Sequence, residues 1–505
     1  MGEASAALHL GDVVFRYYET GKRNILDHVS LDIASGGITV LMGSSGCGKS
    51  TLAAVAAGLY PDNGGSLEQG EILLYGKPVQ EMNQQQRAAY LTEMFQNPDL
   101  QFCMDTLRRE MQFCMENICV PPEQMDERIM QAARSLGMEH LLDRKLQMLS
   151  GGEKQKAALC CLYVMESRCI LLDEPFANID RTAAREILGI LERMKAQGRT
   201  IVAIDHQLDV WKDAADEIIV LGTGGQVLKR GINRSNLEES RLLFEQEGLF
   251  YPGQAEDGNK DLGQAEQSAA VELQGVSIFI EESGTKKRWW KSRKKDPICL
   301  LEYADARFLS GQMTAVLGPS GSGKTTTFLS VLKQHPYEGT IRVHGTDLSQ
   351  IRKQELFRQI GIVFQNPANQ FITQNVREEV LQSIRIWEPE TGEEDCLKKA
   401  DRLLSDYGLK QYQRYSPYML SQGQQRRLAV LSVLSGRQQI LFLDEPTYGQ
   451  DYRSTMAIMG QLRKKVREEH LTVVFITHDE ELARLWADRI YRMKGRKLVE
   501  EEGLR

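Results

Sequence analysis

The sequence lacks any uninterrupted apolar run near the length of about 18 residues that a membrane-spanning helix requires. Its amino terminus, MGEASAALHLGD, has neither the basic flank nor the long apolar stretch of a secretory signal. Ala6 stands where a myristoylation signal needs Ser or Thr. We therefore expect a chain that neither spans a membrane nor is secreted, and that reaches a membrane only through partners.

The sequence also lacks an excess of positive charge and a paired spacing of its cysteines. The 62 Lys and Arg residues are outnumbered by 69 Asp and Glu, for a net charge of −7, so we expect no nucleic-acid partner. The nine cysteines show no paired C-x-x-C spacing, which argues against a zinc site. Reduced thiols in a cytosolic protein are the expected state.

The length and the repeats of the sequence indicate two similar domains. A chain of 505 residues exceeds what one core usually supports, and its 42% apolar content is that of a folded protein. GSSGCGKST at 43–51 returns as GPSGSGKTT at 318–326, and LSGGEKQK at 149–156 returns as LSQGQQRR at 420–427. Because further motifs recur in the same order at nearly one offset, we predict domains at 1–235 and 271–505. The polar segment 236–270 between them is predicted to be a linker.

Each half is predicted to be an α/β domain. ITVLMG and MTAVLG are short β-rich runs that feed a Gly-rich turn and then a helix, while CILLDEP and ILFLDEP are typical of buried parallel strands. Polar residues follow these strands at the edge of the sheet where ligands bind in open α/β folds. The segments 104–148 and 373–419 indicate an inserted helical lobe in each half.

The Gly-rich turns have the G-x-x-x-x-G-K-[ST] pattern of a phosphate-binding loop. Such a loop offers backbone N–H groups and a lysine to phosphate oxygens, and a hydroxyl to magnesium. The pattern is formed by Gly43, Gly48, Lys49 and Ser50 in the first half and by Gly318, Gly323, Lys324 and Thr325 in the second. Its recurrence after an apolar strand in both halves argues against a chance match.

Adjacent carboxylates follow the strands that end in LLDEP and FLDEP. Asp173 and Asp444 have the position to hold hydrated Mg²⁺, and Glu174 and Glu445 the position to polarise the attacking water. An isolated Asp-Glu pair at a strand end is usually solvated surface. Two phosphate loops in the same chain reverse that expectation.

With a Gln turn, an LSGGE-type motif and a final His, this order of motifs resembles the ATP-binding-cassette ATPases over nearly all of both halves. The resemblance implies two P-loop NTPase domains, each with a RecA-like core, an antiparallel β subdomain and an inserted helical lobe. It implies ATP and Mg²⁺ as ligands. The implied catalytic residues are Glu174, Glu445, His206 and His478, and the implied magnesium residues are Ser50, Gln96, Asp173, Thr325, Gln365 and Asp444. The implied ATP-binding residues are Tyr17, Gly43, Ser44, Ser45, Gly46, Cys47, Gly48, Lys49, Ser50, Thr51, Gly318, Pro319, Ser320, Gly321, Ser322, Gly323, Lys324, Thr325 and Thr326, with Ser150, Gly151, Gly152, Ser421 and Gly423 of the signature motifs.

The resemblance also implies composite sites, since a signature helix end faces the γ-phosphate held by the other cassette. Both cassettes are present in one chain and are expected to pair with each other, with 177–180 and 448–451 as interface loops. The halves differ in two respects. Tyr17 is implied to stack on adenine in the first half, and the corresponding position of the second half is Ile280. The second signature has Gln422 and Gln424 in place of Gly and Glu.

The text FQNPxxQF resembles the Gln turn of energy-coupling-factor ATPases, and IDHQLD at 204–209 resembles the histidine region of their fused members. This implies the motor subunit of an importer for a vitamin or a transition metal, at the cytoplasmic face of the membrane. Its implied partners are an integral-membrane scaffold protein and a substrate-binding membrane protein. Alternatives are the ATPase of another importer, such as a monosaccharide importer, and a ribosome-associated tandem cassette factor. The substrate itself is not encoded in these motifs.

Three further features of the sequence are candidates for function. KKRWWKSRKK at 286–295 fits a solvated hairpin loop better than a lipid-contacting patch. Cys47 lies in a phosphate loop, where it is either a reactive thiol or an inert buried one. Phe102 and Phe371 follow the two Gln turns, where they either contact a membrane partner or pack in the core.

Overall fold

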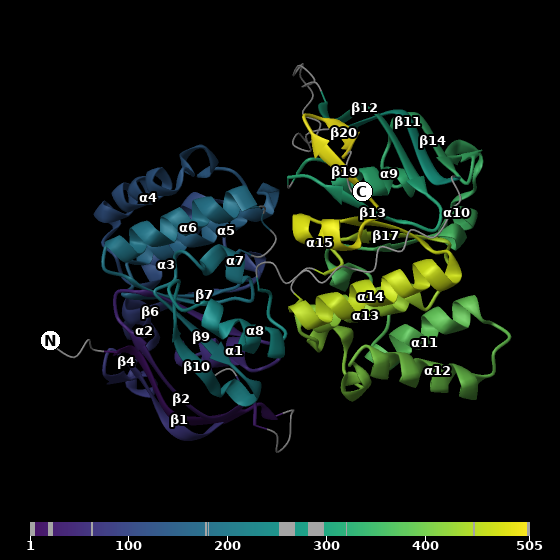
Figure 1. The fold of residues 1–505 in the computed structure, drawn as a ribbon. Coiled ribbons are helices and arrows are strands. Elements are labelled where there is room, and N and C mark those ends of the chain that lie inside the picture. The colour runs from purple at the N-terminus through teal and green to yellow at the C-terminus, as the bar shows by residue number, and fades with distance from the viewer. Residues whose placement is uncertain are drawn as a thin grey trace. The chain divides into compact units, whose positions relative to one another are not determined.

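The structure is a computed structural model that describes residues 6–18, 24–61, 64–176, 179, 181–251, 268–280, 297–319, 321–447 and 450–501. These residues form two compact units, which divide between Tyr251 and Ser268 (Figure 1). The insertion 286–295 lies outside the described residues, as do most of 177–180 and half of 448–451. No helix of the described chain combines the length and the apolar character that crossing a bilayer requires.

The core of the first unit is a six-stranded sheet with the strand order β10-β9-β3-β8-β7-β6. All neighbouring strands are parallel except β9 and β10. The strands are β3 (Ile38–Gly43), β6 (Leu91–Met94), β7 (Cys169–Asp173), β8 (Thr200–Ile204), β9 (Glu217–Leu221) and β10 (Val227–Ile232). Every residue of β3 and of β8 is buried, which explains why these strands are apolar on both alternations.

A second, antiparallel sheet of the first unit has the order β2-β1-β4-β5. Its strands are β1 (Ala6–Arg16), β2 (Leu26–Ala34), β4 (Ser66–Leu74) and β5 (Lys77–Pro78). Along β2, buried positions largely alternate with more exposed ones, as expected of a sheet with one face on the core. This sheet is the implied antiparallel β subdomain.

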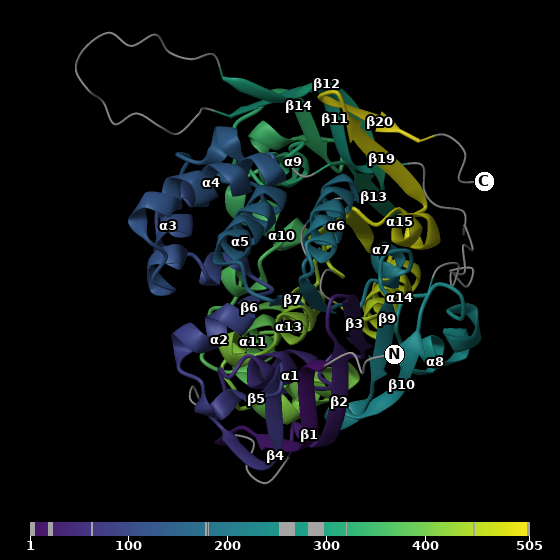
Figure 2. The same ribbon diagram turned by 90° about the vertical axis from the view of Figure 1, so that its left-hand side faces the viewer.

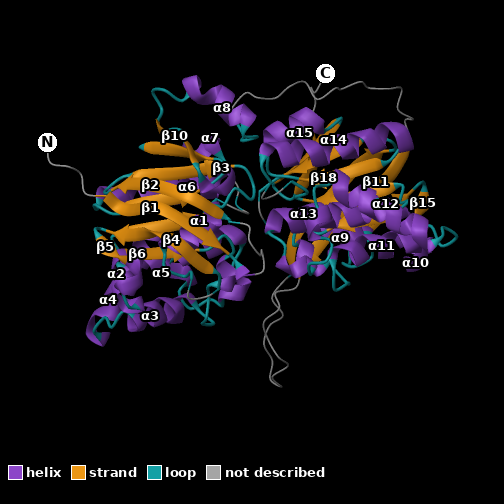
Figure 3. Cartoon of the chain, turned by 90° about the horizontal axis from the view of Figure 1, so that it is seen from below, coloured by secondary structure: helices purple, strands orange, loops and turns teal. Residues whose placement is uncertain are grey.

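Helices pack around these sheets, and three of them form the inserted lobe (Figures 2 and 3). The lobe consists of α3 (Leu107–Asn117), α4 (Pro122–Leu136) and the start of α5 (Gly151–Met165). Helix α4 begins with Pro122 and ends at Gly137, whose φ of 69° is the left-handed conformation that glycine adopts easily after a helix. The remaining helices are α1 (Lys49–Ala56), α2 (Gln84–Tyr90), α6 (Arg181–Ala196), α7 (Leu208–Trp211) and α8 (Arg241–Gln246).

The second unit repeats this architecture. Its sheets have the orders β16-β17-β18-β13-β19-β20 and β12-β11-β14-β15. The strands are β11 (Ala269–Ile280), β12 (Ile298–Leu309), β13 (Met313–Leu317), β14 (Glu338–Val343), β15 (Thr346–Asp347), β16 (Ile360–Val363), β17 (Ile440–Asp444), β18 (Thr472–Ile476), β19 (Arg489–Lys494) and β20 (Lys497–Glu500). The helices are α9 (Lys324–Val331), α10 (Lys353–Gln359), α11 (Val376–Trp387), α12 (Glu393–Asp406), α13 (Gln422–Leu434), α14 (Tyr452–Glu469) and α15 (Glu480–Trp486). The two α/β units with their helical lobes confirm the predicted fold class.

The structure differs from the sequence prediction at the end of the first unit. Residues 236–251, predicted to be the beginning of the linker, include α8 and contribute to the first core. Phe244 and Leu249 are fully buried in that core, and Tyr251 is buried with them. The segment is polar in composition, but these apolar side chains are enough to hold it against the unit.

Candidate nucleotide site

The first phosphate loop connects β3 to α1. The ammonium group of Lys49 donates hydrogen bonds to the carbonyl oxygens of Gly43, at 2.6 Å, and Ser44, at 3.0 Å. Gly48 precedes the helix with a φ of 109°, which favours glycine, and a Cβ on Gly43 would lie 2.5 Å from the Leu221 carbonyl oxygen. The loop is therefore closed around the lysine, and the first N–H groups of α1 are open to an anion. Ser45, Gly46, Cys47, Ser50 and Thr51 complete this loop and the first turn of α1.

The second phosphate loop has the same geometry between β13 and α9. Lys324 donates to the carbonyl oxygens of Gly318, at 2.6 Å, and Pro319, at 2.9 Å. Gly323 precedes α9 with a φ of 98°. Gly321, Ser322, Thr325 and Thr326 lie in this loop and the helix that follows, whereas Ser320 lies outside the described residues. Within each unit, the predicted phosphate-binding residues that the structure describes therefore form a loop of the same geometry.

Each loop lies beside an aspartate at the end of a neighbouring strand, half-buried Asp173 in the first unit and buried Asp444 in the second. Thr325 Oγ1 donates a 2.6 Å hydrogen bond to Asp444 Oδ2. In the first unit the Ser50 hydroxyl favours the charged form of Asp173. Burial raises the pKa of Asp173 to about 7, with a further rise from the Glu174 carboxylate, and burial raises the pKa of Asp444 to about 6. A buried carboxylate beside a hydroxyl gains a partner when a hard cation binds, so these residues fit Mg²⁺.

No group of three or more His, Cys, Asp or Glu side chains in the described chain has the arrangement to hold a metal by itself. Magnesium usually takes one or two protein ligands and completes its octahedron with waters and phosphate oxygens. The pairs Ser50 with Asp173 and Thr325 with Asp444 are sets of that kind.

In the first unit, Glu174 contacts both the Gln turn and the histidine. Gln96 Nε2 donates to Glu174 Oε2 at 2.5 Å, and His206 Nδ1 lies 3.5 Å from Glu174 Oε1. Burial disfavours the charged imidazole, but the Glu174 carboxylate outweighs it, so the pKa of His206 lies above its usual value. The three side chains come from three strand ends of one sheet, and only the fold brings them together.

The corresponding residues of the second unit are arranged differently. His478 Nδ1 lies 3.1 Å from both carboxylate oxygens of Glu445, and that carboxylate raises the pKa of His478. Gln365 is exposed, and no hydrogen bond of the described residues joins its side chain to Glu445.

Both glutamates have an unusual backbone conformation. The φ of Glu174 is 47° and that of Glu445 is 52°, in the left-handed region that non-glycine residues seldom adopt. A hydrogen bond from each backbone N–H to the neighbouring strand holds it there, from Glu174 to Ile204 and from Glu445 to Ile476. Strained backbone of this kind is concentrated at functional sites, so the observation favours a catalytic role for both residues.

The signature serines begin helices, as predicted. Ser150 caps α5 in a reciprocal arrangement with Glu153, and Ser421 caps α13 in the same way with Gln424. Gly151 and Gly152 form the first turn of α5, and Gly423 lies in the first turn of α13. The substitution of Gln424 for a glutamate therefore keeps the helix start and removes one negative charge.

Tyr17 lies directly after β1 and donates or accepts a 3.0 Å hydrogen bond with Thr51 at the start of α1. Its ring packs edge-on against Phe15 and Tyr60, and burial raises its pKa to about 12. Ile280 is the last residue of β11 and pairs with Ile298. An aromatic ring beside the phosphate loop is therefore a feature of the first unit alone at this position.

Sequence analysis missed three kinds of residue around this site. Asp205, next to His206, is buried and bound by Trp211. Arg426 of the second unit is buried and donates to the carbonyl oxygens of Gln365 and Asp444, where the first unit has Gln155. Glu110 and Glu379 are buried and bind the backbone that follows each Gln turn. The sequence could have indicated these residues, because each is a charged residue in a helix or strand segment whose neighbouring core positions are apolar.

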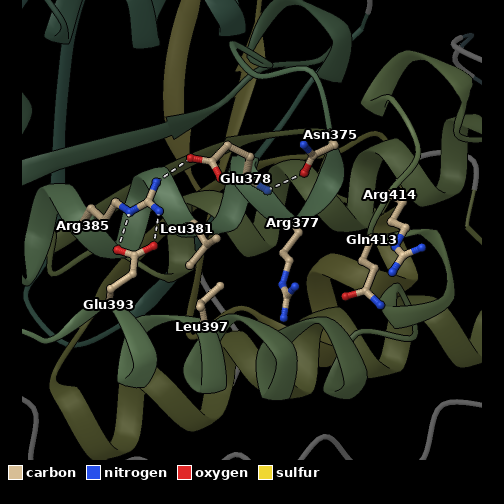
Figure 4. A pocket seen from close by; sticks show the side chains of 9 residues that line it. All are labelled: Asn375, Arg377, Glu378, Leu381, Arg385, Glu393, Leu397, Gln413 and Arg414. Carbon is tan, nitrogen blue, oxygen red and sulfur yellow. Dashed lines mark hydrogen bonds and ion pairs between the residues drawn. The ribbon is translucent and has the colours of Figure 1, made fainter.

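A polar pocket of about 490 Å³ lies elsewhere, in the helical lobe of the second unit (Figure 4). Arg385 in this pocket binds Glu378 at 2.5 Å and also Glu393, so its charge is compensated. The lining residues are Asn375, Arg377, Glu378, Leu381, Arg385, Glu393, Leu397, Gln413 and Arg414, and none of them is a predicted site residue.

Comparisons with known proteins agree with this geometry. A family model described as ABC transporter matches residues 26–177 and 301–448. The chain is 33% identical over 496 residues to the putative HMP/thiamine import ATP-binding protein YkoD of Bacillus subtilis, covering 94% of this chain and 87% of the relative. It is 31% identical to a putative ABC transporter ATP-binding protein of Methanosarcina mazei, covering 97% of this chain and 88% of the relative.

Among solved structures, a chain of the model of ribosome-bound archaeal Pelota and ABCE1 matches with a TM-score of 0.66. The match covers 98% of this chain and 79% of that chain at 18% identity, which is a likeness of fold alone. The family match in both halves and the two closed phosphate loops lead to one conclusion. The chain belongs to the ABC transporter family and is an ABC transporter ATPase with two cassettes.

Proposed function

We propose that this chain is the motor subunit of an energy-coupling-factor importer for a vitamin or a transition metal. In this proposal it lies at the cytoplasmic face of the membrane, bound to an integral-membrane scaffold protein that also carries a substrate-binding membrane protein. The relative from Bacillus subtilis, named for HMP/thiamine import, supports an importer. The structural observation that carries the proposal is a set of exposed apolar side chains in each unit, which lie after the Gln turn and before the signature helix and which we call a patch.

The first patch consists of Leu100, Met104 and Met148 in the first unit. All three side chains are exposed, and Leu100 is exposed to 78%. The buried Glu110 carboxylate accepts hydrogen bonds from the backbone of Met104, at 2.6 Å, and Cys103, at 2.9 Å. Apolar side chains on a backbone held in this way are typical of a surface that a partner covers.

The second patch consists of Ile372, Tyr418 and Met419. Ile372 is exposed to 78%, and the Tyr418 hydroxyl donates a 3.1 Å hydrogen bond to the Phe371 carbonyl oxygen. Buried Glu379 accepts hydrogen bonds from the backbone of Ile372, at 3.1 Å, and of the next residue. A buried glutamate therefore holds an exposed apolar segment in both units, although the apolar side chains differ.

The burial of the phenylalanines that follow the Gln turns supports one of their two interpretations. Phe371 is buried in the second core and packs edge-on against Tyr418, with ring centroids 6.1 Å apart. Phe102 packs against the first core and is only partly buried. Core packing is thus the better interpretation of both rings, and the exposed neighbours Leu100 and Ile372 are the proposed partner contacts.

The proposed motor acts through residues that touch the nucleotide and the attacking water. Lys49 and Lys324 would bind phosphate oxygens, and Asp173 and Asp444 would hold Mg²⁺ with Ser50 and Thr325. Glu174 and Glu445 would orient and deprotonate water, with His206 and His478 beside them. Magnesium supplies charge neutralisation on the phosphate oxygens when it is bound. Because Gln96 binds Glu174 and is followed in the chain by Leu100 of the first patch, the first Gln turn would report the state of the site to the partner.

The proposal is tested by placing a charge in each patch and measuring co-purification with membrane proteins. Leu100→Glu and Ile372→Glu, alone and together, are expected to abolish recovery of the chain with its membrane partners. The ATPase activity and thermal stability of the isolated chain should stay at the wild-type level, because neither side chain contributes to a core. Leu242→Glu is the matched control, since Leu242 is 65% exposed on α8 and belongs to neither patch.

Two outcomes would contradict the proposal. One is wild-type recovery of the double variant with membrane proteins. The other is recovery of the wild-type chain with ribosomes and not with membranes, which would favour a translation factor.

A further inference from the structure

The two units differ in the residue that precedes the candidate catalytic histidine. In the first unit this residue is Asp205, only 2% exposed at the end of β8. Its Oδ1 accepts hydrogen bonds from the backbone N–H groups of His206, at 2.7 Å, and Gln207, at 3.0 Å. Its Oδ2 accepts a 2.8 Å hydrogen bond from Trp211 Nε1. This carboxylate therefore fixes the backbone on which His206 is carried.

Trp211 also contacts the segment that carries Glu174. The indole is fully buried, and its ring centroid lies 4.8 Å from that of Phe176, two residues after Glu174. Trp211 thus binds the loop before His206 through a hydrogen bond and the loop after Glu174 through ring packing. We name Asp205, Trp211 and Phe176 the aromatic clamp.

The second unit has none of the three side chains. The positions that correspond in the repeat are Thr477, Ala483 and Thr447. The Thr477 hydroxyl accepts a 3.1 Å hydrogen bond from the Asp479 backbone, so a neutral group caps the histidine loop there. A buried carboxylate needs hydrogen-bond donors and a buried indole needs an acceptor, which gives a physical reason for Asp and Trp to occur together.

The clamp coincides with a difference in how the glutamate meets the histidine. His206 Nδ1 lies 3.5 Å from Glu174 Oε1 and 3.8 Å from Asp205 Oδ1, so it is placed between two carboxylates. His478 Nδ1 lies 3.1 Å from both oxygens of Glu445. In the first unit the Glu174 carboxylate has two partners, because Gln96 donates a hydrogen bond to one oxygen and His206 lies near the other.

We propose that Trp211 and Asp205 are positioning residues that set the relation of Glu174 to His206 in the first cassette, and that the second cassette works without such a device. The inference rests on the proposed catalytic roles of Glu174 and His206. Neither Trp211 nor Asp205 is expected to touch the nucleotide. An ordinary core tryptophan would bind a backbone carbonyl oxygen, whereas this one binds a buried carboxylate next to the histidine.

Steady-state ATP hydrolysis by the full chain tests the clamp with two conservative variants, both made in a Glu445→Gln parent so that turnover by the second candidate site does not mask a loss in the first. Trp211→Phe keeps an aromatic ring against Phe176 and removes the N–H donor, and Asp205→Asn keeps the shape and removes the charge. Each is expected to lower kcat by about tenfold, the size of effect expected when one hydrogen bond to a charged group is lost. KM for ATP should stay within about twofold, because the phosphate loop is untouched. The double variant should be little worse than either single one, since both changes remove the same hydrogen bond.

Trp486→Phe is the matched control in the second unit. Trp486 ends α15, and its Nε1 has no hydrogen-bond partner among the described residues, so the change should leave kcat and KM at wild-type values. The midpoint of thermal unfolding of every variant is measured to confirm that the assayed protein is folded. If Trp211→Phe fails to fold, Asp205→Asn decides by itself.

The clamp is refuted if folded Asp205→Asn and Trp211→Phe keep kcat within twofold of the Glu445→Gln parent, or if they change KM alone. Additive losses in the double variant would also refute it, since the two residues would then act independently. A Glu174→Gln variant separates this outcome from a wrong site assignment. Undiminished turnover after Glu174→Gln would overturn the proposed role of Glu174, whatever the clamp variants show.

Discussion

Thr325 donates a 2.6 Å hydrogen bond to Asp444, which joins the first turn of α9 to the carboxyl end of β17. In the first unit the Ser50 hydroxyl, also from the first turn after the phosphate loop, favours the charged form of Asp173 at the end of β7. A hydroxyl from the phosphate loop and a carboxylate from the neighbouring strand therefore meet in both cassettes, which is the arrangement on which the proposed magnesium site depends.

Magnesium loading should depend on pH near neutrality. Burial raises the pKa of Asp173 to about 7 and that of Asp444 to about 6, so below these values a proton must leave before the metal binds. The half-saturating Mg²⁺ concentration for ATP hydrolysis is expected to rise as the pH falls from 8 to 6, by up to about tenfold per pH unit below each pKa. The first site should respond at the higher pH. A half-saturating concentration that stays constant over this range would contradict the prediction.

The same shift determines the sign of the effect on stability without metal. Between its usual pKa of 3.8 and about 7, Asp173 binds more protons in the folded state than in the unfolded state. The free energy of unfolding should therefore fall as the pH rises through this range. Addition of Mg²⁺ with ATP should oppose the fall, which thermal unfolding at pH 6 and pH 8 would show.

Glutamine in place of either candidate catalytic glutamate should slow hydrolysis and spare nucleotide binding. Glu174→Gln and Glu445→Gln keep the shape of the side chain and remove its capacity to accept a proton. The double variant is expected to lose about 100- to 10,000-fold in turnover, which is the usual contribution of a general base. The two single variants should differ in turnover, because the two units surround these residues differently. In the first unit Gln96 binds Glu174 and Asp205 lies beside His206, and the described residues of the second unit have no such contacts. Glu239→Gln, at an exposed position of the first unit, is the control, and wild-type turnover in the double variant would disprove the assignment.

Thiol modification should distinguish Cys47 from the exposed cysteines. Cys47 is 3% exposed and its Sγ lies 3.8 Å from Lys49 Nζ, whereas Cys103 and Cys119 are exposed. An alkylating reagent is expected to label Cys103 and Cys119 first without loss of activity. Slower labelling of Cys47 should abolish ATP hydrolysis, because the packed loop has no room for an added group, and ATP should protect it.

Cys47→Ser provides the matched variant, since Ser322 stands at the same position of the second loop. It should hydrolyse ATP normally and resist inhibition. Mass spectrometry identifies the labelled thiols. Full activity after proven alkylation of Cys47 would show that this loop does not contribute to turnover.

A buried ion pair is expected to contribute strongly to the stability of the second unit. Arg463 Nη1 lies 2.9 Å from both carboxylate oxygens of Asp488, with side chains only 12% and 7% exposed, and Asp488 also accepts the Met313 N–H at 2.7 Å. Arg463→Met should leave that carboxylate uncompensated and cost about 3 to 5 kcal/mol. Thermal or urea unfolding of the second unit measures the change.

The exposed pair of Lys398 and Glu394 is the comparison for this ion pair. Lys398→Met should change the free energy of unfolding by less than about 1 kcal/mol, because solvent screens the pair. Equal losses for the two variants would show that burial does not decide the contribution of these ion pairs.

Local sequence determined the parts of this protein whose chemistry lies in contiguous residues. The repeat, the two phosphate loops around Lys49 and Lys324, and the acidic strand ends at Asp173 and Asp444 were all evident from spacing and residue type. A phosphate loop works through backbone N–H groups and a lysine within eight residues, so its sequence pattern specifies its geometry.

Tertiary structure decided what depends on packing between distant segments. Trp211 meets Phe176 across 35 positions of the sequence, and its role appears only when its indole is seen on the buried Asp205. Phe371 is buried while its neighbour Ile372 is exposed. Phe244 packs in the first core although the segment around it is polar in composition. Burial depends on which surfaces the fold brings together, and neither composition nor spacing encodes that directly.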